Sequence, residues 1–201
     1  IFGASFMVLA PEHPLVEQLV TADRREDVLE YSTWAKNRSE VERQQEKKIT
    51  GKFTGAYAKH PFVEGRLIPI WTADYVLWGY GTGAIMAVPA GDSRDYAFAK
   101  QFDLPILPII DGVDISEEAY EAKEGKFINS DFLNGLEIKE ALRKAIDAIE
   151  AKGIGKARIN FRLRDPNFSR QRYWGEPFPI VFRDGLPYAL PESELPVTLP
   201  K

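Results

Sequence analysis

The sequence predicts an α+β domain in which a β-barrel or a set of packed sheets is surrounded by helices. The chain has 201 residues, of which 44% are hydrophobic and 12% aromatic, enough to bury a core. Many short apolar runs are separated by glycine, proline and aspartate, which is typical of strands. Three or four helical patterns lie among them without the strict alternation of a doubly wound fold. No internal repeat interrupts this pattern.

The first half of the chain is predicted to hold most of the strands, at residues 4–10, 52–58, 67–72, 75–78 and 85–88. Pro14 suits the first position of a short helix over residues 15–20. The charged stretch 23–46 predicts two exposed helices. Ser39, followed three residues later by Glu42, fits a capping box for the second of them.

The second half is predicted to be more helical. Residues 92–102 form one helix, with Phe98 and Phe102 on one face, and residues 137–152 form another, whose apolar stripe ends at Gly153. Strands are expected at 106–110, 156–164 and 178–182. Asp184 and Gly185 predict a hairpin turn after the last strand.

Composition excludes several classes of function. The chain has no cysteine, and its two histidines, His13 and His60, stand outside any ligand-spaced cluster, so no metal site is expected. The apolar run at residues 1–10 is too short for a membrane span and lacks a basic leader. A cytoplasmic protein is expected. Because the chain starts within a strand pattern at Ile1, an excised piece of a larger protein is expected too.

Charge is unevenly distributed. A net charge of −4 and an isoelectric point near 5.4 argue against nucleic-acid binding through the whole surface. The stretch 158–172 is nevertheless basic, with two phenylalanines between its arginines. A local strip of this kind suits an RNA segment or a solvated face, and charge alone leaves both open. Its arginines are Arg158, Arg162, Arg164, Arg170 and Arg172.

The segment GYGTGA at residues 79–84 fits a loosened G-x-G-x-x-A pattern. A phosphate-binding loop of that type needs a helix directly after the glycines. The following residues, Ile85 to Val88, read as a strand that Pro89 ends. The glycines therefore predict a turn or a close backbone approach, and not a nucleotide site.

The strand after the glycines leads to an acidic helix start. Met86 and Val88 are expected on one face of the strand, and Ile85 on the other. Asp92 suits the N-cap of the next helix, and Asp95 suits its first turn, where a carboxylate complements the helix dipole. An apolar wall beside such a carboxylate would also hold a small aliphatic ammonium compound. Spacing alone leaves both interpretations of Asp95 open.

The chain resembles the editing domain of bacterial leucyl-tRNA synthetases, a connective insertion in the class I synthetase fold. The likeness covers essentially the whole chain. Its motifs are YGTGAIMAVPAGDSRDYAFAKQFDLPI, the preceding HPFVEGRLIPIWTADYVLWGYGTG and the later RINFRLRDPNFSRQRYWGEPFPIV. The resemblance implies a β-barrel-like core surrounded by helices. It also implies hydrolysis of the ester that joins a wrong amino acid to the acceptor end of tRNA(Leu). The wrong amino acids would be isoleucine, norvaline or methionine-like residues.

The resemblance also implies roles for residues. Asp95 would hold the substrate ammonium, with Asp92 and Arg94 beside it as further catalytic residues. Met86 and Val88 would line the amino-acid pocket, Tyr80 would lie near the substrate's terminal ribose, and Thr82 would be a further substrate-binding residue. The tRNA would be contacted by Arg164, Arg170 and Arg172. Residues 1–155 would form the editing core, and residues 156–201 the return strands and linker.

Three departures from the family pattern stand out. The family has a threonine-rich segment just before the position of Ile1, and a histidine where this chain has Gly91. The signatures of amino-acid activation are absent. Editing is therefore expected without a cofactor, with ATP used only by the parent enzyme. Two alternatives remain: a non-catalytic module that docks the tRNA acceptor end, and the editing domain of an isoleucyl- or valyl-tRNA synthetase.

Overall fold

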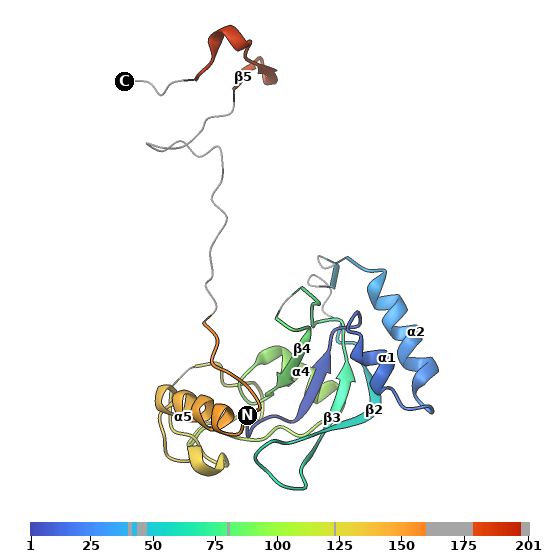
Figure 1. Cartoon of the computed structure of the whole chain (residues 1–201), viewed down its shortest axis with the longest axis vertical. Helices are drawn as coiled ribbons and strands as arrows, with labels where there is room; N and C mark the ends of the chain where they lie inside the picture. Colours follow the sequence, from blue (N-terminus) through green and yellow to red (C-terminus); the bar gives the residue numbers. More distant parts are fainter. Residues whose placement is uncertain (40–41, 44–47, 80, 123, 160–178, 198–201) are drawn as a thin grey trace. The chain divides into compact units, whose positions relative to one another are not determined.

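The computed structural model describes the chain except for residues 40–41, 44–47, 80, 123, 160–178 and 198–201 (Figure 1). It divides into two compact units, Ile1–Ala157 and Arg158–Lys201. The first unit contains a four-stranded sheet with helices packed on it. The described part of the second contains a two-stranded hairpin.

The sheet of the first unit has the strand order β2-β3-β1-β4. Strand β1 is central: it runs parallel to β3 and antiparallel to β4, so Val8 lies between Trp71 and Ile85. Strand β2 pairs antiparallel with the outer side of β3. The strands are β1 (Phe6–Leu9), β2 (Lys52–Lys59), β3 (Leu67–Thr72) and β4 (Ala84–Ala87).

Both faces of β1 are covered, which explains its uninterrupted apolar sequence FMVL. Phe6 and Val8 point into a cluster with Phe98 of helix α4, where the Phe6 and Phe98 rings stack at 5.2 Å between centroids. Leu9 points to the other face, where it packs with Val16 and Val28 of helices α1 and α2. The central strand is therefore the boundary between two cores.

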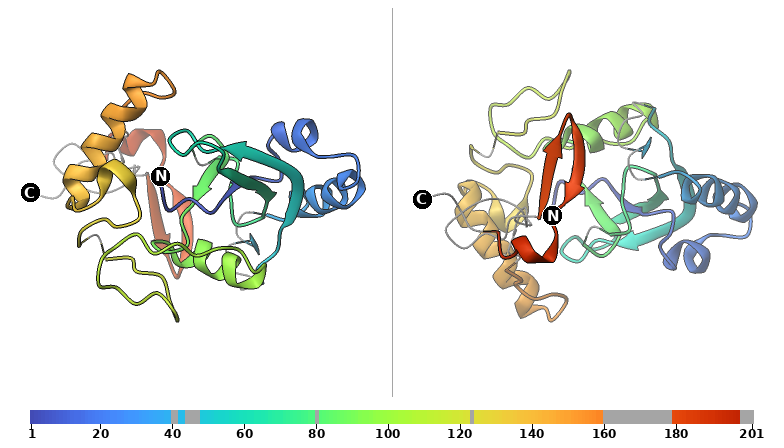
Figure 2. Two further views of the ribbon diagram at one scale, coloured as in Figure 1. Left: turned by 90° about the horizontal axis from the view of Figure 1, so that it is seen from below. Right: turned by 90° about the horizontal axis from the view of Figure 1, so that it is seen from above.

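Helices lie at both ends of the sheet (Figure 2). Helix α5 lies at one end, where its Ala141 packs with Phe2 and with Leu133 of a short 3-10 helix, Asp131–Leu133. Helices α1 and α2 lie at the other end. The helices are α1 (Leu15–Leu19), α2 (Arg25–Lys36), α4 (Ser93–Gln101) and α5 (Ile138–Ala151). None in the described part of the chain is long and apolar enough to cross a membrane.

The predicted α+β class is confirmed, but the predicted barrel is not. The sheet is open, with β2 and β4 as its edges among the described residues. Closing a sheet on itself requires its two outer strands to pair. Here β4 pairs only with β1, and β2 only with β3. The chain covers the sheet with helices instead.

The predicted helix caps and the predicted hairpin turn are confirmed. The Ser39 and Glu42 side chains bond each other's backbone N–H groups at 3.2 and 2.7 Å, which confirms the capping box. Helix α5 ends at Ala151 with Lys152 as its C-cap, followed by Gly153 with φ of +65°. In the second unit, Asp184 and Gly185, both with positive φ, join β5 (Ile180–Arg183) to β6 (Leu186–Ala189). A second 3-10 helix, Glu192–Glu194, follows that hairpin.

Two predicted strands are wrong, and a third lies largely outside the described residues. Residues 75–78 form a turn, in which the Val76 N–H donates to the Ala73 carbonyl at 3.3 Å. Residues 106–110 contribute only a bridge between Ile110 and Phe127. Residues 156–159 are irregular, and 160–164 lie outside the described residues. Residues 75–78 and 106–110 are apolar enough for strands, but Tyr75, Val76 and Ile106 pack in or against the cluster that contains Phe98, so tertiary packing decides their conformation.

Candidate functional site at the start of helix α4

The site is built on the first turn of α4, which Asp92 caps. The Asp92 side chain accepts hydrogen bonds from the backbone N–H groups of Arg94 and Asp95, at 2.9 and 3.1 Å. The Ser93 N–H donates to the Glu121 carboxylate at 2.9 Å. Acidic groups therefore satisfy the free N–H groups of this helix end and complement its dipole. The predicted N-cap role of Asp92 is confirmed.

Asp95 is the buried member of the site, with 5% of its surface exposed. One carboxylate oxygen accepts from the Tyr75 hydroxyl at 2.8 Å, and the other accepts from the Val88 backbone N–H at 2.9 Å. Tyr75 follows β3, Val88 follows β4 and Asp95 belongs to α4. Three separate segments thus converge on one carboxylate.

Burial raises the pKa of Asp95 above its ordinary value of 3.8. The hydrogen bonds from Val88 and Tyr75 act in the opposite direction, because they favour the ionised form. The neighbouring Asp92 raises the pKa of Asp95 further, and Arg94 lowers it. Desolvation outweighs the hydrogen bonds, so an added positive charge near Asp95 would stabilise its ionised form.

Arg94 points outward from the same turn. Its side chain is 72% exposed, and its Nε lies 3.8 Å from Asp92 Oδ1. An exposed pair at this separation contributes little to stability. The Arg94 guanidinium is thus available to an anionic group that approaches the helix start.

The other residues predicted for the pocket lie on and beside β4. Met86 is 42% exposed, whereas Ala87 on the opposite face is fully buried, as the alternation predicts. The Val88 side chain lies beside Gly3, whose added Cβ would come within 3.0 Å of it. The Thr82 hydroxyl bonds locally to the Ala84 carbonyl at 3.2 Å. Tyr80 lies outside the described residues.

The glycine segment is not followed by a helix, which confirms that it is no dinucleotide loop. Gly81 and Gly83 have φ of +64° and +72°, and β4 starts directly after them. A Cβ on Gly83 would lie 2.7 Å from the Trp78 ring. Gly83 therefore serves the close approach that the sequence predicts.

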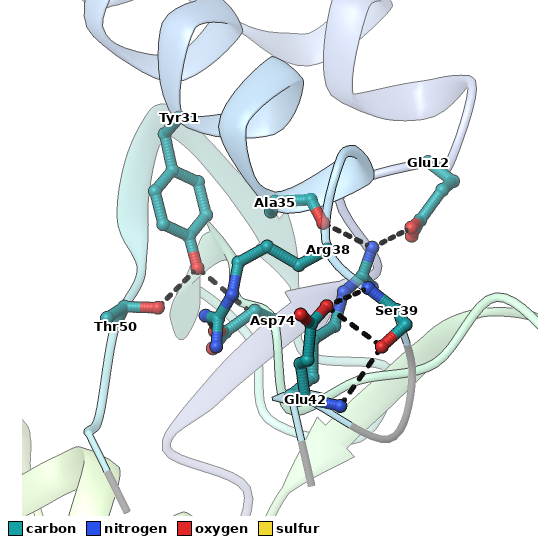
Figure 3. A network of polar contacts seen from close by, with 9 residues as sticks. Glu12, Tyr31, Ala35, Arg38, Ser39, Glu42, Thr50 and Asp74 are labelled. Atoms are coloured by element: carbon teal, nitrogen blue, oxygen red, sulfur yellow. Dashed lines mark hydrogen bonds and ion pairs between the residues drawn. The ribbon is translucent and has the colours of Figure 1, made fainter. Parts of the chain in front are cut away.

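A cavity of about 480 Å³ adjoins the start of α4. Tyr75, Ser93 and Arg94 form the wall nearest the site. Thr50 and Asp74, which also line the cavity, belong to a polar network that joins α2 to the turn after β3 (Figure 3). In that network Asp74 pairs with Arg38 at 3.1 Å, and the Tyr31 hydroxyl bonds Thr50 at 2.9 Å. The remaining lining residues are Arg43, Lys48, Ile49, Leu77 and Ala97.

Arg164, Arg170 and Arg172 lie outside the described residues, so the arginine strip remains a prediction. The described part of the chain contains no group of three histidine, cysteine or acidic side chains that could hold a metal ion.

Sequence reasoning missed two contributors to the site. The sequence predicts a strand at Tyr75 and no role for Glu121. Tyr75 lies 20 residues from Asp95 and Glu121 lies 28 residues from Ser93, so no local spacing links them. Val88 was predicted through its side chain, whereas its contact with Asp95 uses the backbone N–H.

Comparison with known proteins defines first the class and then the family. Residues 1–150 match the family model described as leucyl-tRNA synthetase, editing domain. The chain is thus an editing domain of an aminoacyl-tRNA synthetase. It belongs to the leucyl-tRNA synthetase family.

Relatives of known name agree with this assignment. The chain is 54% identical to the leucine–tRNA ligase of Azobacteroides pseudotrichonymphae and 58% identical to that of Christiangramia forsetii. Both alignments cover 100% of this chain, but only 22% and 21% of the relatives. The chain therefore spans about a fifth of their length, as a fragment. These names also argue against the isoleucyl or valyl alternative.

A solved structure is similar along nearly the whole chain. It is the ternary complex of Agrobacterium radiobacter K84 agnB2 LeuRS with tRNA and LeuAMS. The TM-score is 0.59 and the identity is 29%, over 98% of this chain and 22% of that one.

Proposed function

We propose that this domain hydrolyses the ester of mischarged tRNA(Leu) and that Asp95 holds the ammonium group of the wrongly attached amino acid. The observation that carries the proposal is the buried Asp95 carboxylate, which is bonded to the Val88 N–H directly after the strand that carries the exposed Met86. A carboxylate offers about four acceptor positions, of which Val88 and Tyr75 occupy two. The remaining positions suit an ammonium donor.

Burial strengthens such a contact. A charge-assisted hydrogen bond is roughly twice as strong as a neutral one. The raised pKa of Asp95 reflects the cost of an uncompensated buried charge. An arriving ammonium would compensate that charge, so the site favours a positively charged ligand over a neutral one of the same shape.

The proposed reaction needs no cofactor in this domain. An ester of an amino acid is already activated, so its hydrolysis depends on a positioned water molecule and a fixed orientation of the ester. Met86 and Val88 would contact the aliphatic side chain, Tyr80 would lie near the terminal ribose, and Thr82 would be a further substrate contact. Arg94, which is 72% exposed, would face the phosphates of the acceptor end. ATP would serve only the synthetic reaction of the parent enzyme.

The need for such an activity follows from the limits of apolar recognition. A synthetic site built for leucine discriminates against a similar aliphatic side chain by only about 1–3 kcal/mol. A second site that hydrolyses wrong products removes the remaining errors. We propose isoleucine, norvaline and methionine-like residues as the amino acids removed.

The test is deacylation of isoleucyl-tRNA(Leu) by the full-length parent enzyme with Asp95→Asn. Loss of the charged contact should lower kcat/KM about a hundredfold, or roughly 3 kcal/mol. Asp147→Asn is the matched control, because Asp147 is an exposed helical aspartate on α5. Its kcat/KM should equal that of the wild type. Normal deacylation by Asp95→Asn would refute the role assigned to Asp95.

The same experiment tests the alternative of a non-catalytic docking module. In that case the parent would bind the tRNA acceptor end with a steep salt dependence but without ester hydrolysis. Binding through Arg164, Arg170 and Arg172 would fit either function, and only hydrolysis separates the two.

A further inference from the structure

The Tyr75 hydroxyl is the one side-chain donor that the described structure aims at Asp95. Its oxygen lies 2.8 Å from Asp95 Oδ1. The Tyr75 ring packs against Phe98 of the same helix, at 5.5 Å between centroids. The Tyr75 ring is therefore fixed by its packing against Phe98, and the Tyr75 hydroxyl is bonded to the Asp95 carboxylate.

We propose that Tyr75 is a positioning residue for the editing reaction, which fixes the Asp95 carboxylate in the orientation that receives the substrate ammonium. This inference rests on the function proposed for Asp95. The terminal torsion of an aspartate has a broad, roughly two-fold energy profile. With Tyr75 on one oxygen and the Val88 N–H on the other, rotation is blocked from both sides. Without the hydroxyl, one hydrogen bond alone would hold the carboxylate.

The hydroxyl also affects the charge of Asp95. The groups that face this carboxylate are Tyr75, the Val88 N–H, Asp92 and Arg94. Burial and Asp92 raise the pKa of Asp95, whereas the two hydrogen bonds and Arg94 lower it. Burial and nearby acids raise the pKa of Tyr75 as well, so its hydroxyl stays protonated and remains a donor. Removal of the hydroxyl should raise the pKa of Asp95 further.

The test is Tyr75→Phe in the full-length parent enzyme, assayed by deacylation of isoleucyl-tRNA(Leu) across a range of pH. The ring and its contact with Phe98 are retained, so the fold should be retained too. We expect kcat/KM to fall about tenfold at neutral pH, the size of one hydrogen bond to a charged group. The acidic limb of the pH profile should move to higher pH, because Asp95 must be ionised to bind the ammonium.

The matched control is Tyr96→Phe, one residue along α4 from Asp95. Its hydroxyl is also in the interior, where it donates to the carbonyl groups of Ile115 and Ser116 at 3.1 and 2.7 Å. This variant loses a comparable hydrogen bond outside the site. Its stability should fall with no shift of the pH profile. An equal shift in both variants would show that Tyr75 acts only through stability and would overturn the proposal.

A double variant separates this inference from the proposed function. If Asp95→Asn lowers kcat/KM about a hundredfold, adding Tyr75→Phe should cause little further loss, because both changes act through one carboxylate. If Asp95→Asn is inactive while Tyr75→Phe has the wild-type rate and pH profile, the positioning role is refuted and the function of Asp95 stands. If Asp95→Asn deacylates normally, both proposals fail.

Discussion

At the scale of the residue, Asp95 combines a structural and a functional position. It stands in the first turn of α4, where any carboxylate complements the helix dipole. Yet it is 5% exposed, and burial raises its pKa, which an ordinary capping acid at the surface would not show. A charge kept in a costly environment is a frequent mark of a functional site.

The raised pKa predicts how stability depends on pH. A carboxyl group whose pKa is raised by folding stabilises the folded state below its ordinary pKa, and this contribution is lost as pH rises through the folded value. The stability of the wild-type chain relative to Asp95→Asn should therefore fall as pH rises from the ordinary pKa of 3.8 through the raised pKa of the folded state. Urea unfolding of both proteins at several pH values measures it. A difference that rises with pH would contradict the burial of Asp95, and Asp147→Asn should show no trend.

At the scale of the element, a partly buried ion pair fixes α2 to the turn after β3. Arg38 follows α2, and its guanidinium contacts Asp74 with side-chain exposures of 16% and 7%. The Tyr31 hydroxyl accepts from the Asp74 N–H at 3.0 Å, which closes the network of Figure 3. Burial raises the pKa of Asp74 in spite of the nearby arginine. The ionised form of the Asp74 carboxylate therefore depends on Arg38 for its stability.

Removal of one partner from this pair should be costly. Arg38→Met should lower the free energy of unfolding by about 3 kcal/mol, because Asp74 would be left buried without its compensating charge. Lys52→Met is the control: Lys52 pairs with Asp27 at 3.5 Å, with side-chain exposures of 46% and 63%. Its cost should stay below about 1 kcal/mol. Chemical denaturation measures the free energy of unfolding of both variants. Equal losses would show that the buried ion pair contributes no more to stability than the exposed one.

Helices and strands that have clear periodicity or capping residues were predicted to within a residue or two. Segments without such patterns were not. Strand β3 coincides with the predicted 67–72, and α4 has the expected cap. Residues 75–78 have strand-like composition, but Tyr75 turns inward to Phe98 and Asp95. No local pattern contains that contact, because both partners lie 20 or more residues away.

At the scale of the whole molecule, the cores belong to the first unit. The buried clusters around Phe98, Val28 and Leu133 all lie within Ile1–Ala157. In the second unit, the described hairpin leaves Phe182 72% exposed. A two-stranded hairpin without a covered face is marginally stable by itself.

This distribution predicts that residues 1–157 fold without the rest of the chain. A truncated protein should unfold cooperatively, with a Tm within about 4 °C of the 201-residue chain, since about 1 kcal/mol shifts Tm by this amount at such a size. Thermal unfolding followed by circular dichroism measures both proteins. A broad, non-cooperative transition of the shorter protein would show that the second unit contributes to the core.

Local patterns in the sequence are sufficient to predict the α+β class, a strand at residues 4–10, the capped start of α4 and the family. These follow from periodicity, capping residues and motifs, which act over a few neighbouring residues. The open sheet and the meeting of Tyr75, Val88 and Asp95 are seen only in the folded structure. Strand closure and side-chain convergence depend on contacts between distant segments, and these are set by packing on both faces of β1.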